Sequence, residues 1–237
     1  MSPSTLTWNY EAKVLDKVIS AWCQEGSTSD SRPIDRAANV RESFPPFPGS
    51  LSEPIRNCSN SNQSNEEWFE APGFLSAHPV EVENPTLYPV VRFSIRRRQG
   101  NLEVAVRIAA FYLIAVNKVA ADGWRFEMPD SGHVATDKFH HFPHVQRISG
   151  WKPGDKLGFS PPGTTNESVS GELVDSVTGF NEKRPAFPLP CSSAAGVVIA
   201  VMASLYGANK TNRILENYVN KPKWLKEEIT AILRSGS

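Results

Sequence analysis

The hydrophobic positions of the chain change period along its length, from helical spacing to strand spacing and back. Residues 7–25 place large apolar side chains near one face of a helix, and Gly26 ends it. Beyond residue 85 apolar and polar side chains alternate, as they do along strands. We predict strands over residues 87–98, 102–116, 124–129 and 144–151, with the first two joined by a turn as an antiparallel hairpin.

Helical spacing returns after a proline-rich segment. Ser192 or Ser193 is expected to cap an apolar helix that ends at Gly207. Pro222 opens a final amphipathic helix. The order of one helix, a run of strands and then helices predicts an α+β fold. We expect an antiparallel sheet of about four to six strands, with the N-terminal helix and the C-terminal helices packed on one face.

The chain of 237 residues is predicted to form a single domain over residues 1–237. Residues 27–67 are rich in Ser, Asn and Pro, so we interpret them as an extended linker with Phe44 and Phe47 as anchors. The net charge of zero argues against binding nucleic acid or membrane by bulk charge. Three scattered cysteines, no signal-peptide pattern and no membrane-spanning run predict a soluble cytoplasmic protein.

Residues 123–151 hold four of the five histidines of the chain. His140 and His144 have the spacing of a helical zinc motif, but Pro143 lies between them and excludes a helix there. If residues 123–128 pair with residues 144–149, four polar side chains share one face of the sheet. These are Arg125, Glu127, His144 and Gln146.

This face suits acid–base chemistry on a phosphodiester or ester. His144 would be the acid or base, Glu127 its orienting group and Arg125 an anion clamp, with His141 or His140 as a second proton carrier. No cofactor is predicted. A divalent metal on His133, His140 and Asp137 is an alternative, and a hydrogen-bonded polar sheet face without catalysis is another.

Arginines gather on the predicted hairpin. They are Arg92, Arg96, Arg97 and Arg98 on its first strand and Arg107 on its second. Such a stripe can contact a nucleic-acid backbone or an acidic partner. Charges that protect an exposed edge strand give the same pattern, and the zero net charge favours that interpretation.

Motifs for nucleotide-binding loops, serine nucleophiles and paired-cysteine sites are absent from the sequence. Cys191 lies at the start of the apolar helix, where a helix N-terminus can lower a thiol pKa. We favour a buried, inert cysteine there.

The strand WRFE at residues 124–127, followed by FPHVQ at residues 142–146, resembles a pattern in small bacterial proteins. In those proteins a Tyr-Arg-Phe-Asp strand precedes a His-Pro-x-x-His-x-His run, and some are encoded in toxin–antitoxin or phage-defence neighbourhoods. The resemblance covers residues 123–148 and, more loosely, 185–206. Gln146 stands where the last histidine of that run would be.

Two functional hypotheses follow. The favoured one is a non-catalytic subunit or binding module of a bacterial complex, with a protein partner, and the resemblance implies a place in defence or toxin–antitoxin systems. The alternative is a phosphodiesterase or nuclease-like hydrolase that uses Arg125, Glu127 and His144.

Overall fold

The structure is a computed structural model of the whole chain. It describes residues 8–25, 46–60, 68–81, 86–98, 100–115, 118–128, 143–148 and 187–235. Statements about the fold refer to these residues.

The described residues form an eight-stranded antiparallel sheet. Its strands are β1 (Phe69–Glu70), β2 (Leu75–Ser76), β3 (Val80–Glu81), β4 (Thr86–Arg98), β5 (Asn101–Ala115), β6 (Lys118–Glu127), β7 (His144–Ile148) and β8 (Phe187–Pro188). The long strands lie in the order β4-β5-β6-β7. Three short strands, β1, β2 and β3, pair with the outer edge of β4, and β8 pairs with β7.

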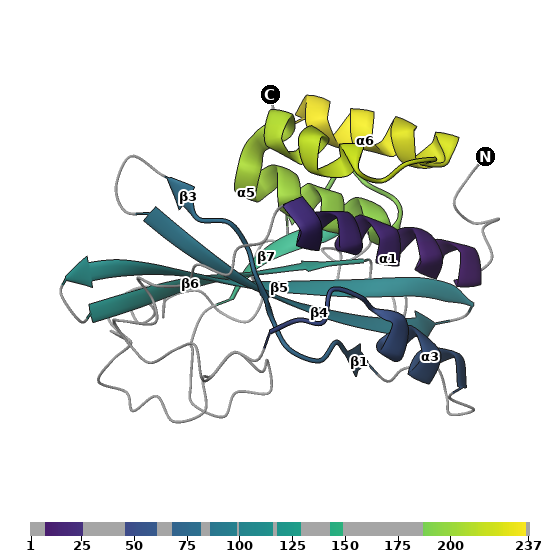
Figure 1. Ribbon diagram of the computed structural model, residues 1–237, viewed down its shortest axis with the longest axis horizontal. Helices are drawn as coiled ribbons and strands as arrows, with labels where there is room; N and C mark the ends of the chain where they lie inside the picture. Colours follow the sequence, from purple (N-terminus) through teal and green to yellow (C-terminus); the bar gives the residue numbers. More distant parts are fainter. Residues whose placement is uncertain are drawn as a thin grey trace.

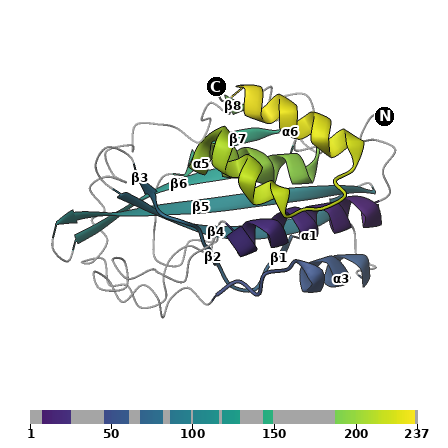
Figure 2. The ribbon, with the colours of Figure 1, turned by 45° about the horizontal axis from the view of Figure 1, so that its top comes forward.

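Four helices accompany the sheet in the described part of the chain: α1 (Trp8–Glu25), α3 (Ser52–Asn60), α5 (Ala194–Glu216) and α6 (Lys223–Ser235). Helices α1 and α5 lie against one face of the sheet, and α6 packs on α5 farther from the strands (Figures 1 and 2). This arrangement confirms the predicted α+β class and the helices on one face. None of the described helices has both the length and the apolar content needed to cross a membrane.

The core lies between the helices and one face of the sheet. Trp22 of α1 is fully buried and meets the ring of Phe93 on β4 edge to face, with ring centroids 5.8 Å apart. Its indole N–H donates a hydrogen bond to the hydroxyl of Tyr206 on α5. Phe47 packs on the same Phe93 ring, which confirms one of the two predicted anchors. Phe44 lies outside the described residues.

Two predictions of local structure were wrong. The sheet has more strands than the four to six expected, because β1, β2, β3 and β8 have two residues each and are too short to show a period. Residues 117–123 were predicted to be a connection, but β6 begins at Lys118 and pairs with β5 from there. Small residues in this stretch hide the alternation that marks a strand.

The predicted linker also contains structure. Helix α3 lies within residues 27–67, and both Cys58 of this helix and Leu51, which directly precedes it, are buried. The carboxylate of Asp16 on α1 accepts a hydrogen bond from the backbone N–H of Leu51 at 2.6 Å, which fixes the start of the helix. The interpretation as an extended linker is therefore wrong for residues 52–60, and residues 26–45 and 61–67 lie outside the described part.

The apolar helix near the C-terminus begins where the sequence predicts. Ser193 is its N-cap, with the hydroxyl accepting from the N–H of Gly196 at 2.9 Å. Gly207 has a positive φ of 72° and a non-helical backbone, so the apolar helical segment ends there as predicted, and a second helical segment of α5 continues to Glu216. The remaining turns are held by buried Ile214 and Leu215, which continue the apolar face beyond the kink.

Candidate functional site

The predicted pairing of residues 123–128 with residues 144–149 is confirmed. β6 and β7 are antiparallel neighbours, with Glu127 opposite His144 and Arg125 opposite Gln146. Directly opposed residues in an antiparallel pair lie on the same face of the sheet. The four positions that the sequence singles out therefore share the sheet face that is turned away from the helices.

Three of these side chains are in contact. Arg125 Nε lies 2.9 Å from Glu127 Oε2, and His144 Nε2 lies 4.0 Å from the same oxygen. Glu127 thus lies between a guanidinium and an imidazole. The distance of 4.0 Å to His144 Nε2 is too long for a hydrogen bond, so the role of Glu127 as orienting group stays a prediction. The side chain of Gln146 lies outside the described residues, so its part in the cluster stays a prediction.

His144 is buried at this position. Its side chain is 2% exposed, whereas those of Glu127 and Arg125 are 18% and 31% exposed. On the outer side of His144, Pro188 of β8 is its register partner. A proline suits this edge position because it has no backbone N–H to contribute to the ladder. The imidazole is therefore enclosed within the sheet face, and the guanidinium is the more accessible end of the cluster.

The same face carries a row of arginines. Arg92 on β4 is the register partner of Arg107 on β5, which is in turn the register partner of Arg125 on β6. The three residues therefore form one line across three neighbouring strands. Opposed side chains on neighbouring strands are about 5 Å apart at Cβ. We call Arg92, Arg107 and Arg125 the arginine row. The sequence places Arg92 and Arg107 on one hairpin but does not by itself align them with Arg125.

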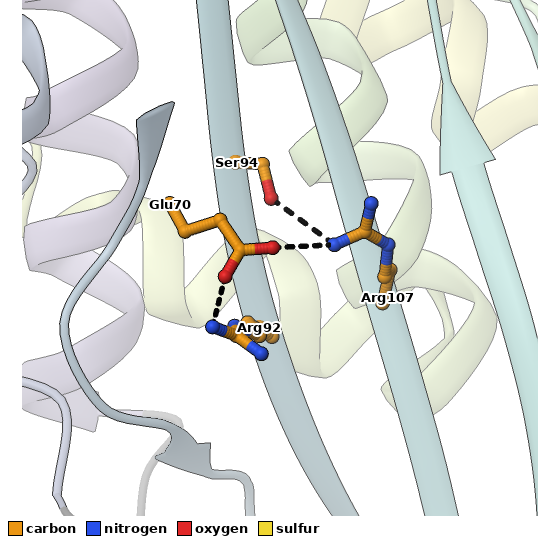
Figure 3. A network of polar contacts seen from close by, with 4 residues as sticks. All are labelled: Glu70, Arg92, Ser94 and Arg107. Atoms are coloured by element: carbon orange, nitrogen blue, oxygen red, sulfur yellow. Dashed lines mark hydrogen bonds and ion pairs between the residues drawn. The ribbon is translucent and has the colours of Figure 1, made fainter. Parts of the chain in front are cut away.

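Glu70 of β1 joins two members of the arginine row. Its carboxylate accepts a hydrogen bond from Arg92 Nη2 through Oε2 and one from Arg107 Nη1 through Oε1, the latter at 3.2 Å (Figure 3). Arg107 Nη1 also lies 3.4 Å from the hydroxyl of Ser94, which is the register partner of Glu70. The guanidinium of Arg92 further stacks on the ring of Phe74 at 5.2 Å. The carboxylate therefore accepts hydrogen bonds from arginines of both β4 and β5.

Arg107 has the most enclosed guanidinium of the row, with a side chain 11% exposed. Burial lowers the pKa of Arg107, and the nearby charge of Arg125 lowers it further, while Glu70 and Glu127 act in the opposite direction. The Nε atom of Arg107 is buried and has no hydrogen-bond partner among the described residues. Buried polar groups are rarely left without a partner, and this N–H is a donor that the described part of the fold does not use.

The other predicted arginines are placed differently. Arg96 forms an ion pair with Glu103, directly across the hairpin, and stacks on the ring of Trp68. Arg97 is exposed on the opposite side of the strand and lies over Trp8 at 5.7 Å. Arg98 is half-buried beside the turn of the hairpin. Arg96 and Arg98 share the face of Arg92 but lie farther along β4, so of the five predicted arginines only Arg92 and Arg107 belong to the arginine row.

The remaining candidates cannot be located. His133, His140, His141 and Asp137 lie outside the described residues, so the divalent-metal alternative and the second proton carrier stay predictions. Within the described part, no three His, Cys, Asp or Glu side chains gather closely enough to hold a metal ion.

A second polar cluster surrounds the start of α5. Glu228 of α6 accepts hydrogen bonds from the backbone N–H groups of Ser192 and Ser193 and from the Ser193 hydroxyl, the last at 2.5 Å. Glu11 of α1 accepts from the N–H of Ala194 at 3.1 Å. The two carboxylates satisfy the N–H groups that a helix start leaves unpaired. The cluster therefore links α1 and α6 to the start of α5 and stabilises the packing of the three helices.

Cys191 lies beside this cluster and is not activated by it. Burial raises the pKa of the Cys191 thiol, and the charge of Glu228 raises it further. The expected inert cysteine is therefore supported, because the helix N-terminus is already occupied by carboxylates.

The sequence does not reveal the partners of the arginine row. Glu70 lies 22 residues before Arg92 and 37 before Arg107, in a two-residue strand that carries no alternation. Glu70 follows two glutamates and two aromatic residues in the stretch EEWFE, so the local sequence does not distinguish it from its acidic neighbours. Comparisons of the chain with protein-family models, with curated proteins and with solved structures find no match.

Proposed function

We propose that the protein is a non-catalytic binding module of a complex, and that the arginine row binds an anionic group of its partner. The observation that carries the proposal is the row itself, three guanidinium groups on neighbouring strands with side chains 31% exposed or less. Like charges directly opposite one another destabilise a sheet. Buried ion pairs are often no more stabilising than apolar residues of similar size. Binding of an anionic group accounts for the arginine row, whereas a contribution to the stability of the fold does not.

The charge balance of this face favours an anion. In the described part of the chain, Glu70 contacts Arg92 and Arg107, and Glu127 contacts Arg125. Arginine is suited to such a site because its planar fork of donors matches the oxygens of a carboxylate or phosphate. A partner that contributes an anionic group would bind to these donors.

The burial of His144 supports binding rather than turnover. A general acid or base has to come within hydrogen-bond reach of the group that it protonates or deprotonates. An imidazole that is 2% exposed and lies between Glu127 and Pro188 has little access to a substrate.

We place this module in the cytoplasm of a bacterium. The three cysteines form no disulfide with one another, which fits a reducing compartment. The resemblance of residues 123–148 to small bacterial proteins supports a place in a defence or toxin–antitoxin complex.

Thermal unfolding in the presence of anions tests the proposal. A ligand that binds the folded state raises the Tm by mass action, so millimolar phosphate, pyrophosphate or citrate should raise it more than chloride at equal ionic strength. The Arg107→Gln variant should lose this increment, because the row loses its central guanidinium. Arg97→Gln, on the same hairpin but the opposite side, is the matched control and should keep the increment. A wild-type Tm that responds to every anion as it does to chloride contradicts the proposal.

The contact of Glu127 with both Arg125 and His144 favours a second candidate, a phosphodiesterase or nuclease-like hydrolase. It predicts that the wild-type protein hydrolyses bis(p-nitrophenyl) phosphate and that His144→Gln abolishes this hydrolysis while the far-ultraviolet circular dichroism spectrum is unchanged. Purified wild-type protein without measurable turnover, with and without added Mg²⁺, Mn²⁺ or Zn²⁺, would rule this candidate out.

A further inference from the structure

The surface of the helix layer carries a group of lysines. They are Lys13 and Lys17 on α1, Lys221 in the connection between α5 and α6, and Lys226 on α6. We call these four residues the lysine patch. We infer that the lysine patch and the apolar side chains at its edge dock the protein on an anionic lipid bilayer. This inference goes beyond the proposed function and does not depend on it, because the arginine row lies on the other side of the sheet.

The fold brings these lysines together from two distant parts of the chain. The ammonium groups of Lys17 and Lys221 lie 5.6 Å and 5.8 Å from the centroid of the same ring, that of Tyr218. The connection between α5 and α6 therefore runs beside α1 (Figure 2). Lys13 lies one turn before Lys17 on the same side of α1, and the positive charge of Lys226 acts on Lys221. The four ammonium groups thus belong to one surface.

The positive charge of the lysine patch is not balanced by ion pairs. None of its four members forms an ion pair with a carboxylate of the described residues. Burial and the charge of Lys226 lower the pKa of Lys221, and Glu216 acts in the opposite direction. Asp16 on α1 is engaged elsewhere, because its carboxylate accepts from a backbone N–H at the start of α3 at 2.6 Å. Although the chain as a whole is neutral, this surface has a local positive charge that attracts anions.

Two exposed apolar side chains lie at the edge of the lysine patch. Tyr10 is 43% exposed and Val219 is 71% exposed, and they are the exposed large hydrophobic residues of the described part of the chain. Tyr10 lies on the same side of α1 as Lys13 and Lys17. Burial raises the pKa of Tyr218, and the neighbouring Tyr10 raises it further. Val219 directly follows Tyr218 in the connection. Single exposed apolar residues are common on protein surfaces, but here both occur beside the same lysines.

This combination favours a bilayer over other anionic partners. Tyrosine is enriched at the membrane–water interface, and lysine keeps its ammonium group in water while its aliphatic part lies along apolar surface. Peripheral proteins bind a bilayer through buried apolar area and through attraction of basic residues to anionic headgroups. A nucleic-acid backbone would use the lysines alone and would leave Tyr10 and Val219 in water.

The choice of lysine also fits an extended surface. Arginine recognises a single phosphate or carboxylate through its planar fork of donors, whereas lysine acts as a point charge on a flexible stem. Four such charges suit a field of many headgroups better than one bound group. Docking through the helix layer would leave the sheet face with the arginine row turned away from the bilayer, since the helices cover the opposite face (Figure 1). Both surfaces can therefore be occupied at the same time.

Co-sedimentation of the full chain with sucrose-loaded vesicles tests the inference. The protein should bind vesicles made of equal parts of phosphatidylcholine and phosphatidylglycerol and should not bind vesicles of phosphatidylcholine alone. Raising the salt concentration from about 0.1 M to about 0.5 M should weaken the binding roughly tenfold, because the headgroup charges are screened. Equal binding to the two kinds of vesicle, or binding to neither, overturns the inference and leaves the proposed function untouched.

Single charge-removing variants locate the surface that binds. Lys17→Gln should bind the mixed vesicles roughly fivefold more weakly than wild type, as expected for one lysine at an anionic surface. Lys13→Gln should show the same loss, and Lys13 has no ring contact in the described part of the chain that its removal would disturb. Arg56→Gln is the matched control: it removes one positive charge from an exposed position of α3, on the other side of α1 (Figure 2), and should change the affinity less than about twofold. Equal losses for all three variants would mean that overall charge, and not the lysine patch, governs binding.

A variant that keeps every lysine separates a bilayer from other polyanions. The double substitution Tyr10→Ser and Val219→Ser should weaken binding to the mixed vesicles roughly tenfold, because the apolar area buried in the interface is lost. Its binding to a fluorescein-labelled single-stranded RNA should equal that of wild type. Val219→Ser alone, at the more exposed position, should show part of the loss at an unchanged Tm. If both variants bind the vesicles as tightly as wild type, the assignment to a bilayer is wrong and the lysine patch binds polyanions by charge alone.

Discussion

Glu127 lies directly opposite His144 in the β6–β7 ladder, and its Oε2 atom is 4.0 Å from Nε2 of an imidazole that is almost completely buried. A buried side chain in contact with a carboxylate contributes to stability through packing and through its polar contacts. This relationship makes His144 first of all a structural residue, whatever the protein binds.

We predict that His144→Ala lowers the free energy of unfolding by about 1–3 kcal/mol, because truncation leaves a cavity and removes a polar contact of Glu127. His78, which is half-buried at the end of β2, provides the matched control, and His78→Ala should cost less than about 0.5 kcal/mol. Urea unfolding followed by tryptophan fluorescence measures both. Equal losses for the two variants would show that the imidazole of His144 contributes little to the fold.

The face that holds His144 could be predicted from the sequence because its signals are local. Trp124 and Phe126 alternate with Arg125 and Glu127, so the period of two assigns the faces before any pairing is known. The pairing of β6 with β7 follows from their proximity in the sequence. What the sequence could not provide is the third strand of the arginine row, since the register between β5 and β6 depends on where β6 begins.

The contacts of Glu70, Glu11 and Glu228 could not be predicted for another reason. Each joins elements far apart in the chain, for example Ala194 to Glu11 across 183 residues. Such contacts follow from packing in three dimensions and leave no periodic trace in the sequence. Helix α3 was missed because its Ser- and Asn-rich composition outweighed the helical spacing of Leu51, Ile55 and Cys58.

The hairpin contains an ion pair whose removal should be costly. Arg96 Nε lies 2.5 Å from Glu103 Oε2, and the two side chains are 13% and 7% exposed. Glu103→Ala leaves a guanidinium without its carboxylate in a buried position, so we predict a loss of about 3 kcal/mol in the free energy of unfolding.

The pair Lys223–Glu227 on α6 is the control for that loss. Its charged atoms are 3.7 Å apart, and the side chains are 91% and 65% exposed. Glu227→Ala should therefore change the free energy of unfolding by less than about 0.5 kcal/mol. Denaturant titrations of the two alanine variants under identical conditions test the contrast. A loss at Glu103 no larger than that at Glu227 would mean that the hairpin pair is screened by solvent.

Glu11 should make stability depend on pH. Burial raises the pKa of Glu11 to about 6, and the charge of Glu228 adds to this, while the hydrogen bond from Ala194 N–H lowers it. A carboxyl group with a raised pKa stabilises the folded state when it is protonated. Its contribution is present below the ordinary value of 4.5 and is lost as the pH rises through about 6.

We predict that Glu11→Gln, which imitates the protonated form, gains stability relative to wild type as the pH rises. The difference in unfolding free energy should grow by about 2 kcal/mol between pH 4.5 and pH 7.5, since one pKa unit corresponds to about 1.4 kcal/mol. Urea unfolding of both proteins at several pH values measures it, and other titrating groups cancel in the difference. A difference that stays constant over this range would indicate that Glu11 ionises with its ordinary pKa in the folded protein.

Gly196 in the first turn of α5 should be intolerant of a methyl group. A Cβ atom at this position would lie 2.5 Å from Glu228 Oε1 and 2.7 Å from the Cβ of Cys191. Replacing glycine by alanine inside a helix ordinarily stabilises it by up to about 1 kcal/mol. Here the added methyl pushes away the carboxylate that caps the helix, so we predict that Gly196→Ala destabilises the protein by about 1–3 kcal/mol.

A double-mutant cycle with Glu228→Ala identifies the cause of that loss. Glu228→Ala alone should destabilise the protein, because the N–H groups of Ser192 and Ser193 lose their acceptor. In the double variant the methyl of Ala at position 196 no longer meets the carboxylate, so the combined loss should be smaller than the sum of the two single losses. Thermal unfolding by circular dichroism gives the four values. Strictly additive losses would show that the methyl group does not act through Glu228 and that contact with Cys191 limits this position instead.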